Sequence, residues 1–82
     1  MQRVRLSPLQ VQILDLLRQP GRIYVHSEIV YQELLGFPKT GSRWTRRAAI
    51  PASVRASVSR SFARLAQRGM IEPVGSAWRL PA

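Results

Sequence analysis

The sequence predicts a small α+β domain, mainly helical with one β-hairpin, that spans residues 1–82. Two observations support this prediction. Apolar residues recur at helical spacing in three stretches, and two short alternating runs flank a Gly-Ser pair near the end. A chain of 82 residues can build one small core but not a catalytic domain beside a binding domain. We therefore expect one domain with one function.

The first helix is predicted over residues 7–19. Its start carries an N-cap serine, a proline at the first helical position, a capping-box glutamine and a hydrophobic staple. These residues are Ser7, Pro8, Gln10 and the pair Leu6 and Val11. The side chains expected to face the core are Leu9, Ile13, Leu16 and Leu17, with Leu14 at the margin. We interpret this helix as scaffold.

A short β-prone run at 22–25 predicts a single strand, which needs a partner elsewhere in the fold. Ser27 can cap a second helix over 27–35, and Gly36 suits its left-handed C-terminal residue. The inner face of this helix is expected to hold Val30, Tyr31, Leu34 and Leu35, flanked by Ile29. His26 is the only histidine in a chain without cysteine, so we interpret it as a helix-start residue rather than a ligand or general base.

Residues 37–49 are rich in Gly, Pro, Ser and Thr, which predicts a loop. The segment is longer than most connections between helices, and such length is typical of functional or disordered segments. Trp44 either stacks on a base, lies against the sugar-phosphate edge, or packs onto the core. The cations of this basic loop, expected to contact phosphates, are Lys39, Arg43, Arg46 and Arg47.

The third predicted helix, 51–68, combines a core stripe with a cationic outer face. Pro51 is expected at its first position and Gly69 just past its end. The core stripe is Val54, Val58, Phe62 and Leu65, bordered by Ser61 and Ala66. The opposite face holds Ala56, Ser59, Arg60, Ala63, Arg64 and Gln67. A helix face exposed only for solubility normally mixes charges, whereas this face has no carboxylate and suits close approach to a polyanion.

The last element is a predicted hairpin over 70–80, with its turn at Gly75 and Ser76 and with Pro73 at an edge position. The run at 22–25 can pair with it as a third strand. The side chains expected to cover the helices are Trp78 and Leu80.

Charge narrows the class of partner. Thirteen basic and four acidic residues give a net charge of +9, which points to nucleic acid, an acidic protein surface or anionic lipid. Residues 36–68 carry eight bases and no acid. All the bases except Lys39 are arginine, whose planar fork suits phosphates and guanine edges, although a GC-rich coding bias explains the excess equally well.

Several classes of protein are excluded. Without cysteine there is no disulfide and no thiolate metal site. No apolar run approaches the roughly 20 residues of a membrane span, and residues 1–10 contain no signal-peptide core. The chain has no paired carboxylates and no glycine-rich phosphate loop. We therefore expect a cytoplasmic protein that is not an enzyme, binds no metal or cofactor, and does not associate with membranes.

The predicted order, helix-strand-helix-helix-strand-strand, resembles the winged helix-turn-helix superfamily of bacterial, archaeal and phage transcriptional regulators. His26 to Phe37 resembles their second-helix consensus, with its serine, Glu-apolar-small triplet and Leu-Gly stop. Ser53 to Phe62 resembles their recognition helix, and Leu65 to Glu72 resembles its exit into the wing. Two features depart from the family. The basic loop at 37–49 replaces a short turn between helices 2 and 3, and the tip of the expected wing is neutral.

The resemblance implies sequence-selective binding of double-stranded DNA, with the third helix in the major groove. By position, the residues placed toward the groove are Ser53, Arg55, Ala56, Ser59 and Arg60, with Arg64 nearer the backbone. Arg60 is the best candidate to contact a guanine edge, and any wing contact depends on Arg79. Such a protein would be a small transcriptional regulator or a DNA-architectural protein.

Two alternatives stay open. An RNA- or ribosome-associated module ranks below DNA binding, because RNA binding favours exposed aromatic residues and only Trp44 is a candidate. A winged helix that binds protein within a nucleoprotein complex would need an exposed apolar patch, which the third helix lacks. We expect a monomer or weak dimer, because residues 1–6 and 81–82 are too few to form dimerisation helices.

Overall fold

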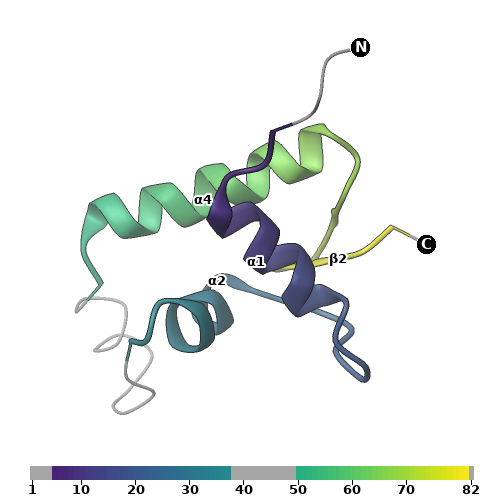
Figure 1. Ribbon diagram of the computed structural model, residues 1–82, viewed down its shortest axis with the longest axis horizontal. Coiled ribbons are helices and arrows are strands. Elements are labelled where there is room, and N and C mark those ends of the chain that lie inside the picture. Colours follow the sequence, from purple (N-terminus) through teal and green to yellow (C-terminus); the bar gives the residue numbers. More distant parts are fainter. Residues whose placement is uncertain (1–4, 38–49, 82) are drawn as a thin grey trace.

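The computed structural model describes residues 5–37 and 50–81 (Figure 1). Its elements are α1 (Pro8–Leu17), α2 (Ser27–Ile29), the π-helix η1 (Val30–Leu34), α4 (Ala52–Gln67), β1 (Glu72–Val74) and β2 (Ala77–Arg79). Helices combined with one small antiparallel sheet confirm the predicted α+β class. In Figure 1, α4 lies along the top, with α1 and α2 below it. No described helix is both long and apolar enough to cross a membrane.

The capping box of α1 is confirmed. The Ser7 hydroxyl accepts a hydrogen bond from the Gln10 backbone N–H at 3.3 Å, and Gln10 Oε1 accepts one from the Ser7 N–H at 2.9 Å. Gln10 is only 3% exposed, so its amide oxygen is satisfied by this bond inside the fold. The helix is shorter than predicted, because it ends at Leu17. Leu14, expected at the margin, is 4% exposed and belongs to the core.

The second helix differs from the prediction in type. Only α2 is α-helical, and the following residues form the π-helix η1, in which each N–H bonds five residues back. Thus the Leu35 N–H donates to the Val30 carbonyl at 3.1 Å. The wider turn carries Leu35 away from the inner face, where the sequence predicts it, and leaves it 39% exposed. Val30 and Tyr31 are buried as expected.

The start of this helix also corrects a prediction. The N-cap is His26 rather than Ser27, and no side chain caps the helix. The His26 carbonyl instead accepts hydrogen bonds from the backbone N–H groups of Ile29 and Val30. At the other end, Gly36 has a φ of +76°, as predicted for the residue that follows the helix.

The core stripe of α4 is confirmed, with Val58, Phe62 and Leu65 buried and packed toward α1. Ser61 is also buried, and its hydroxyl donates to the Ser57 carbonyl at 2.9 Å. The helix begins one residue later than predicted. Pro51 is its N-cap, because a ψ of 144° keeps that residue extended.

The chain leaves α4 through a glycine-ended cap. Gly69 has a φ of +73°, and its N–H donates to the Ala66 carbonyl at 3.0 Å, while the Met70 N–H donates to the Leu65 carbonyl at 3.0 Å. These two bonds form a Schellman motif, which needs a left-handed residue. The motif turns the chain sharply from the helix into β1.

In the hairpin, β1 and β2 pair antiparallel with Val74 opposite Ala77. Gly75, first in the two-residue turn, has a φ of +60°, and Ser76 has a negative φ, which is the type II′ combination. Trp78 of β2 stacks on Phe62 of α4, with ring centroids 5.4 Å apart and planes 8° apart. The sheet is therefore anchored to the longest helix by an aromatic pair.

The predicted strand at 22–25 is reduced to a single bridge. Val25 and Trp78 exchange two backbone hydrogen bonds of 2.8 Å, so the expected third pairing exists at one residue only. Arg22 belongs to the turn after α1, where its N–H bonds the Gln19 carbonyl. Ile23 contributes no strand pairing either.

Phe37 is the described part of the loop predicted at 37–49. Its ring meets the ring of Tyr31 edge-on, with centroids 6.5 Å apart and planes at 83°. Residues 38–49 lie outside the described part of the chain.

Candidate nucleic-acid interface

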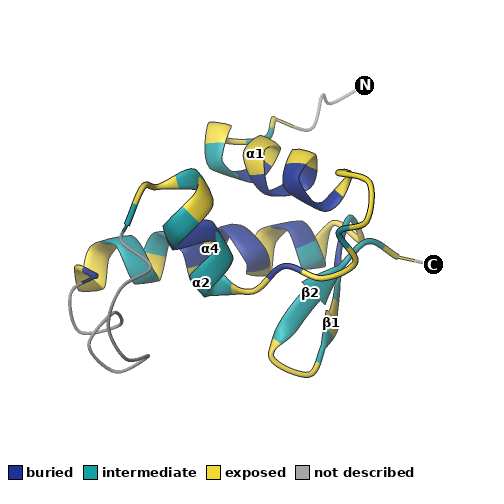
Figure 2. Cartoon of the chain, turned by 90° about the horizontal axis from the view of Figure 1, so that it is seen from below, coloured by how far each residue is buried: buried dark blue, intermediate teal, exposed yellow. Residues whose placement is uncertain are grey.

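The longest helix has one continuous exposed face on the side away from its buried residues, which are dark blue in Figure 2. Its exposed residues are Ala52, Ser53, Ala56, Ser59, Arg60, Ala63, Arg64 and Gln67, and we call this set the α4 face. Every residue predicted for the outer side of the helix belongs to it. Small side chains separate the two arginines, so another molecule can approach the helix backbone closely.

The orientation of the α4 face is set by the core. Val58, Phe62 and Leu65 are buried on the opposite side, and burying a side chain of this size stabilises the fold by roughly 1.5–3 kcal/mol. Rotating the helix by one residue, or about 100°, would expose this stripe and bury guanidinium groups. The arginines of the face are therefore held in solvent by the packing behind them.

The side chains of Arg60 and Arg64 make no hydrogen bond or ion pair with any other residue in the described part of the chain. Arginines on other elements do have carboxylate partners. Arg22 pairs with Glu33 at 3.0 Å, and Arg79 pairs with Glu72 at 2.6 Å. Since α4 contains no acidic residue, its two exposed guanidinium groups keep their full donor capacity.

The predicted contact residues in the first turns of α4 differ in how exposed they are. Ser53 and Ala56 are exposed. Arg55 is half-buried, and its Nε is buried without a hydrogen-bond partner among the described residues. A buried unpaired N–H group costs about 1–3 kcal/mol, so the stem of Arg55 lies against the protein under a penalty that the exposed arginines do not have. Its predicted contact with DNA stays a prediction.

At the hairpin, the guanidinium of Arg79 is already engaged. Its Nε donates to Glu72 Oε1 across the strand pair, where the two residues lie directly opposite each other. The turn itself carries no charge, since it consists of Gly75 and Ser76. A wing contact through Arg79, predicted from the sequence, would have to compete with this ion pair.

The residues predicted to contact phosphates from the basic loop, and Trp44 within it, lie outside the described residues. The described residues carry eight arginines and four carboxylates, a net +4 of the chain's +9. More than half of the net charge therefore belongs to residues 1–4 and 38–49, and the α4 face carries two of the exposed arginines of the remainder.

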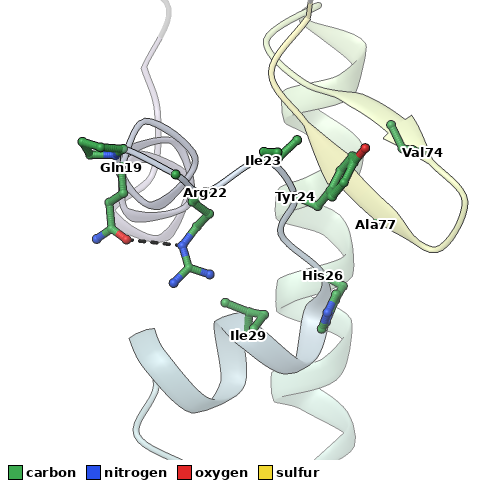
Figure 3. A pocket seen from close by; sticks show the side chains of 10 residues that line it. Gln19, Arg22, Ile23, Tyr24, His26, Ile29, Val74 and Ala77 are labelled. Atoms are coloured by element: carbon green, nitrogen blue, oxygen red, sulfur yellow. Dashed lines mark hydrogen bonds between the residues drawn. The ribbon is translucent and has the colours of Figure 1, made fainter.

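Sequence reasoning missed an open groove of about 710 Å³ beside the hairpin (Figure 3). The turn after α1 lines one side, and Ile29, Val74 and Ala77 line the other. Ile23 is 66% exposed and Tyr24 is 48% exposed at its edge. The alternation of an extended chain was a usable signal, because a Val25 that faces the core places Tyr24 on the opposite side.

Nothing in the described residues forms a group of three or more His, Cys, Asp or Glu side chains that could hold a metal ion. His26 is exposed at the start of α2. The α4 face offers hydrogen-bond donation by planar guanidinium groups that lie among uncharged, mostly small side chains. This combination suits a polyanion.

No protein-family model, curated protein or solved structure matches the chain. Its function must therefore be inferred from the α4 face and from the arrangement of the elements around it.

Proposed function

We propose that the chain is a winged helix-turn-helix domain that binds double-stranded DNA sequence-selectively, as a small transcriptional regulator or DNA-architectural protein of the nucleoid. The observation that carries the proposal is the α4 face, which is exposed, free of carboxylates and equipped with two arginines that have no partner among the described residues. The order of the elements also supports it, with the hairpin following α4 and with β2 lying between β1 and Val25.

The dimensions of α4 suit the major groove. A helix of 16 residues is roughly 24 Å long, and a groove about 12 Å wide admits a helix. The side chains of Ala56, Ser59 and Ala63 are small, so the helix can approach base edges closely. Arg60 lies near the middle of the contact, where a bidentate pair with guanine is possible, and Arg64 lies one turn further, nearer a phosphate.

The first test is competition between nucleic acids. A labelled duplex bound to the protein is challenged, at one fixed salt concentration, with unlabelled duplex or with RNA of equal length. We expect duplex to compete at about a tenfold lower concentration than RNA, a difference of about 1.4 kcal/mol. Equal or better competition by RNA would refute DNA as the ligand and favour an RNA-binding module.

The second test concerns Arg60 and needs a preferred duplex selected from a random pool. Arg60→Ala should reduce discrimination between that duplex and random duplex by about 1–3 kcal/mol, because alanine cannot form the bidentate bond to a base. Arg18→Ala is the matched control, since Arg18 is an exposed arginine at the end of α1, outside the α4 face. An equal reduction in affinity for both duplexes would show that Arg60 contacts a phosphate instead.

A further inference from the structure

The small sheet has two edges, and they differ in what they offer to another chain. On the β1 side, the residue that faces outward is Pro73. It lies opposite Trp78, whose N–H and C=O both bond Val25 on the other side of β2. The pair Pro73 and Trp78 is therefore non-hydrogen-bonded, and the outward edge of β1 has no N–H donor at this position. Proline protects this edge from pairing.

The opposite edge, residues 22–24, is open at Tyr24, whereas the Arg22 N–H is already bonded to the Gln19 carbonyl. Val25 uses its N–H and C=O to bond Trp78, so the backbone groups of Tyr24 point away from the sheet. Neither Ile23 nor Tyr24 makes a hydrogen bond with any other described residue. Both side chains are also largely exposed. Unpaired backbone groups beside exposed apolar side chains are the features to which an extended chain adds as a strand.

The groove beside the hairpin adjoins this edge and supplies an apolar surface from Ile29, Val74 and Ala77 (Figure 3). None of its lining residues is acidic. Arg22, at one end of the edge, is already paired with Glu33, so the attraction for a negatively charged occupant comes from the chain as a whole, which carries +9. Charge complementarity therefore favours an occupant with negative charge, and it disfavours a second copy of this strongly basic chain.

We propose that residues 22–24 bind an extended, acidic segment of another protein as an added β-strand, with alternate apolar side chains of that segment in the groove. In Figure 1 the turn after α1 projects below the body of the molecule, while α4 lies along the top with its buried side turned toward α1. The α4 face and this edge thus point in different directions. The protein can hold a polyanion and a peptide at the same time, and the peptide site does not depend on the proposed DNA binding.

The test uses ¹⁵N-labelled protein and a short peptide of alternating valine and glutamate with blocked ends. Titration should shift the backbone amide signals of Ile23 and Tyr24 and slow hydrogen exchange at the Tyr24 amide. Two further peptides carry N-methyl groups on alternate sets of backbone nitrogens. The peptide whose methylated nitrogens face the edge should bind about tenfold or more weakly than the parent peptide. The peptide whose methylated nitrogens face away from the edge should bind almost as tightly as the parent. A valine-lysine peptide of equal length should also bind about tenfold more weakly than the acidic one.

Ile23→Asp should weaken peptide binding by about tenfold or more, because it places a carboxylate beside an acidic ligand. Val11→Asp, a change at an exposed apolar residue of α1 outside the groove, should leave binding unchanged, and the amide spectrum of each variant reports whether it is folded. Absence of any shift at Tyr24, or equal weakening by both methylated peptides, would overturn the proposal. So would protection of Tyr24 that grows with protein concentration alone and accompanies a dimer in sedimentation, because a second copy would then occupy the edge. None of these outcomes bears on DNA binding.

Discussion

Trp78 joins three parts of the molecule. Its ring stacks on Phe62 of α4, its backbone pairs with Val25, and it lies opposite Pro73 in the hairpin. An aromatic pair of this kind contributes about 0.5–1.5 kcal/mol beyond the area it buries. A single half-buried residue therefore sets the position of the sheet relative to the helices, and it does so without any charge.

At the residue scale, we predict that Ser7 acts on stability alone. Ser7→Ala removes one of the two capping-box bonds and should lower the free energy of unfolding by about 0.5–2 kcal/mol. Denaturant titration measures this decrease, and Ser7→Asp is the control, because aspartate also accepts an N-cap bond. At a temperature where both proteins are fully folded, duplex affinity should not change. A weaker affinity there would mean that the start of α1 contacts the ligand.

At the element scale, the two ion pairs lie away from α4 and neutralise arginines that would otherwise compete with it for anions. Arg22 is held by Glu33, and Arg79 is held by Glu72 across the hairpin. Both pairs are partly exposed to solvent, so each contributes at most about 1 kcal/mol to stability. Their larger effect is on where an anion can bind.

Glu72→Gln should therefore free Arg79 for a phosphate. We expect stability to change by less than about 1 kcal/mol, random-duplex affinity to rise, and the slope of log K against log salt to steepen by roughly 0.9. Glu33→Gln removes the same charge at a pair outside the hairpin and is the control. If the two variants raise affinity equally, only net charge matters and the hairpin makes no contact.

At the scale of the whole molecule, the two proposed ligand surfaces are separated. The α4 face lies on one side, the open edge at 22–24 on another, and the acidic residues Glu33 and Glu72 are paired on elements outside α4. In the proposed complex with DNA, long-range attraction would come from the net charge of the whole chain, whereas selectivity would come from the few donors held rigidly on α4.

A variant of the basic loop separates these two contributions. Changing the four cations of residues 37–49 to alanine should weaken binding to preferred and random duplex alike. It should also flatten the salt slope by roughly 0.9 for each phosphate that the protein no longer neutralises. Binding isotherms at several salt concentrations measure both effects, and Arg60→Ala should show the opposite pattern, with its effect on the preferred duplex. A four-alanine variant that is weakened mainly on the preferred duplex would mean that the loop itself contacts bases.

The sequence alone was sufficient wherever the cause lies within a few residues. The capping box of Ser7 and Gln10 and the turn at Gly75 depend on local backbone geometry. The division of α4 into a buried stripe and an exposed face depends on helical period, and the sequence predicts it except at Val54 and Arg55, which are both half-buried. The sequence places helix ends only to within one or two residues, as Pro51 and Leu17 show. A capping residue differs from the adjacent helical residue by only one or two backbone dihedral angles.

The tertiary structure decided what depends on a neighbour that is distant in sequence. Val30–Leu34 forms a π-helix rather than an α-helix, and no periodicity in the sequence marks this difference. Arg79 meets Glu72 because the hairpin register places them opposite each other. The strand predicted at 22–25 is reduced to Val25, which pairs with Trp78 of β2, while the Arg22 N–H bonds the Gln19 carbonyl in the turn after α1. Pairing across a sheet is a property of two segments, so one segment's composition cannot determine how many residues take part.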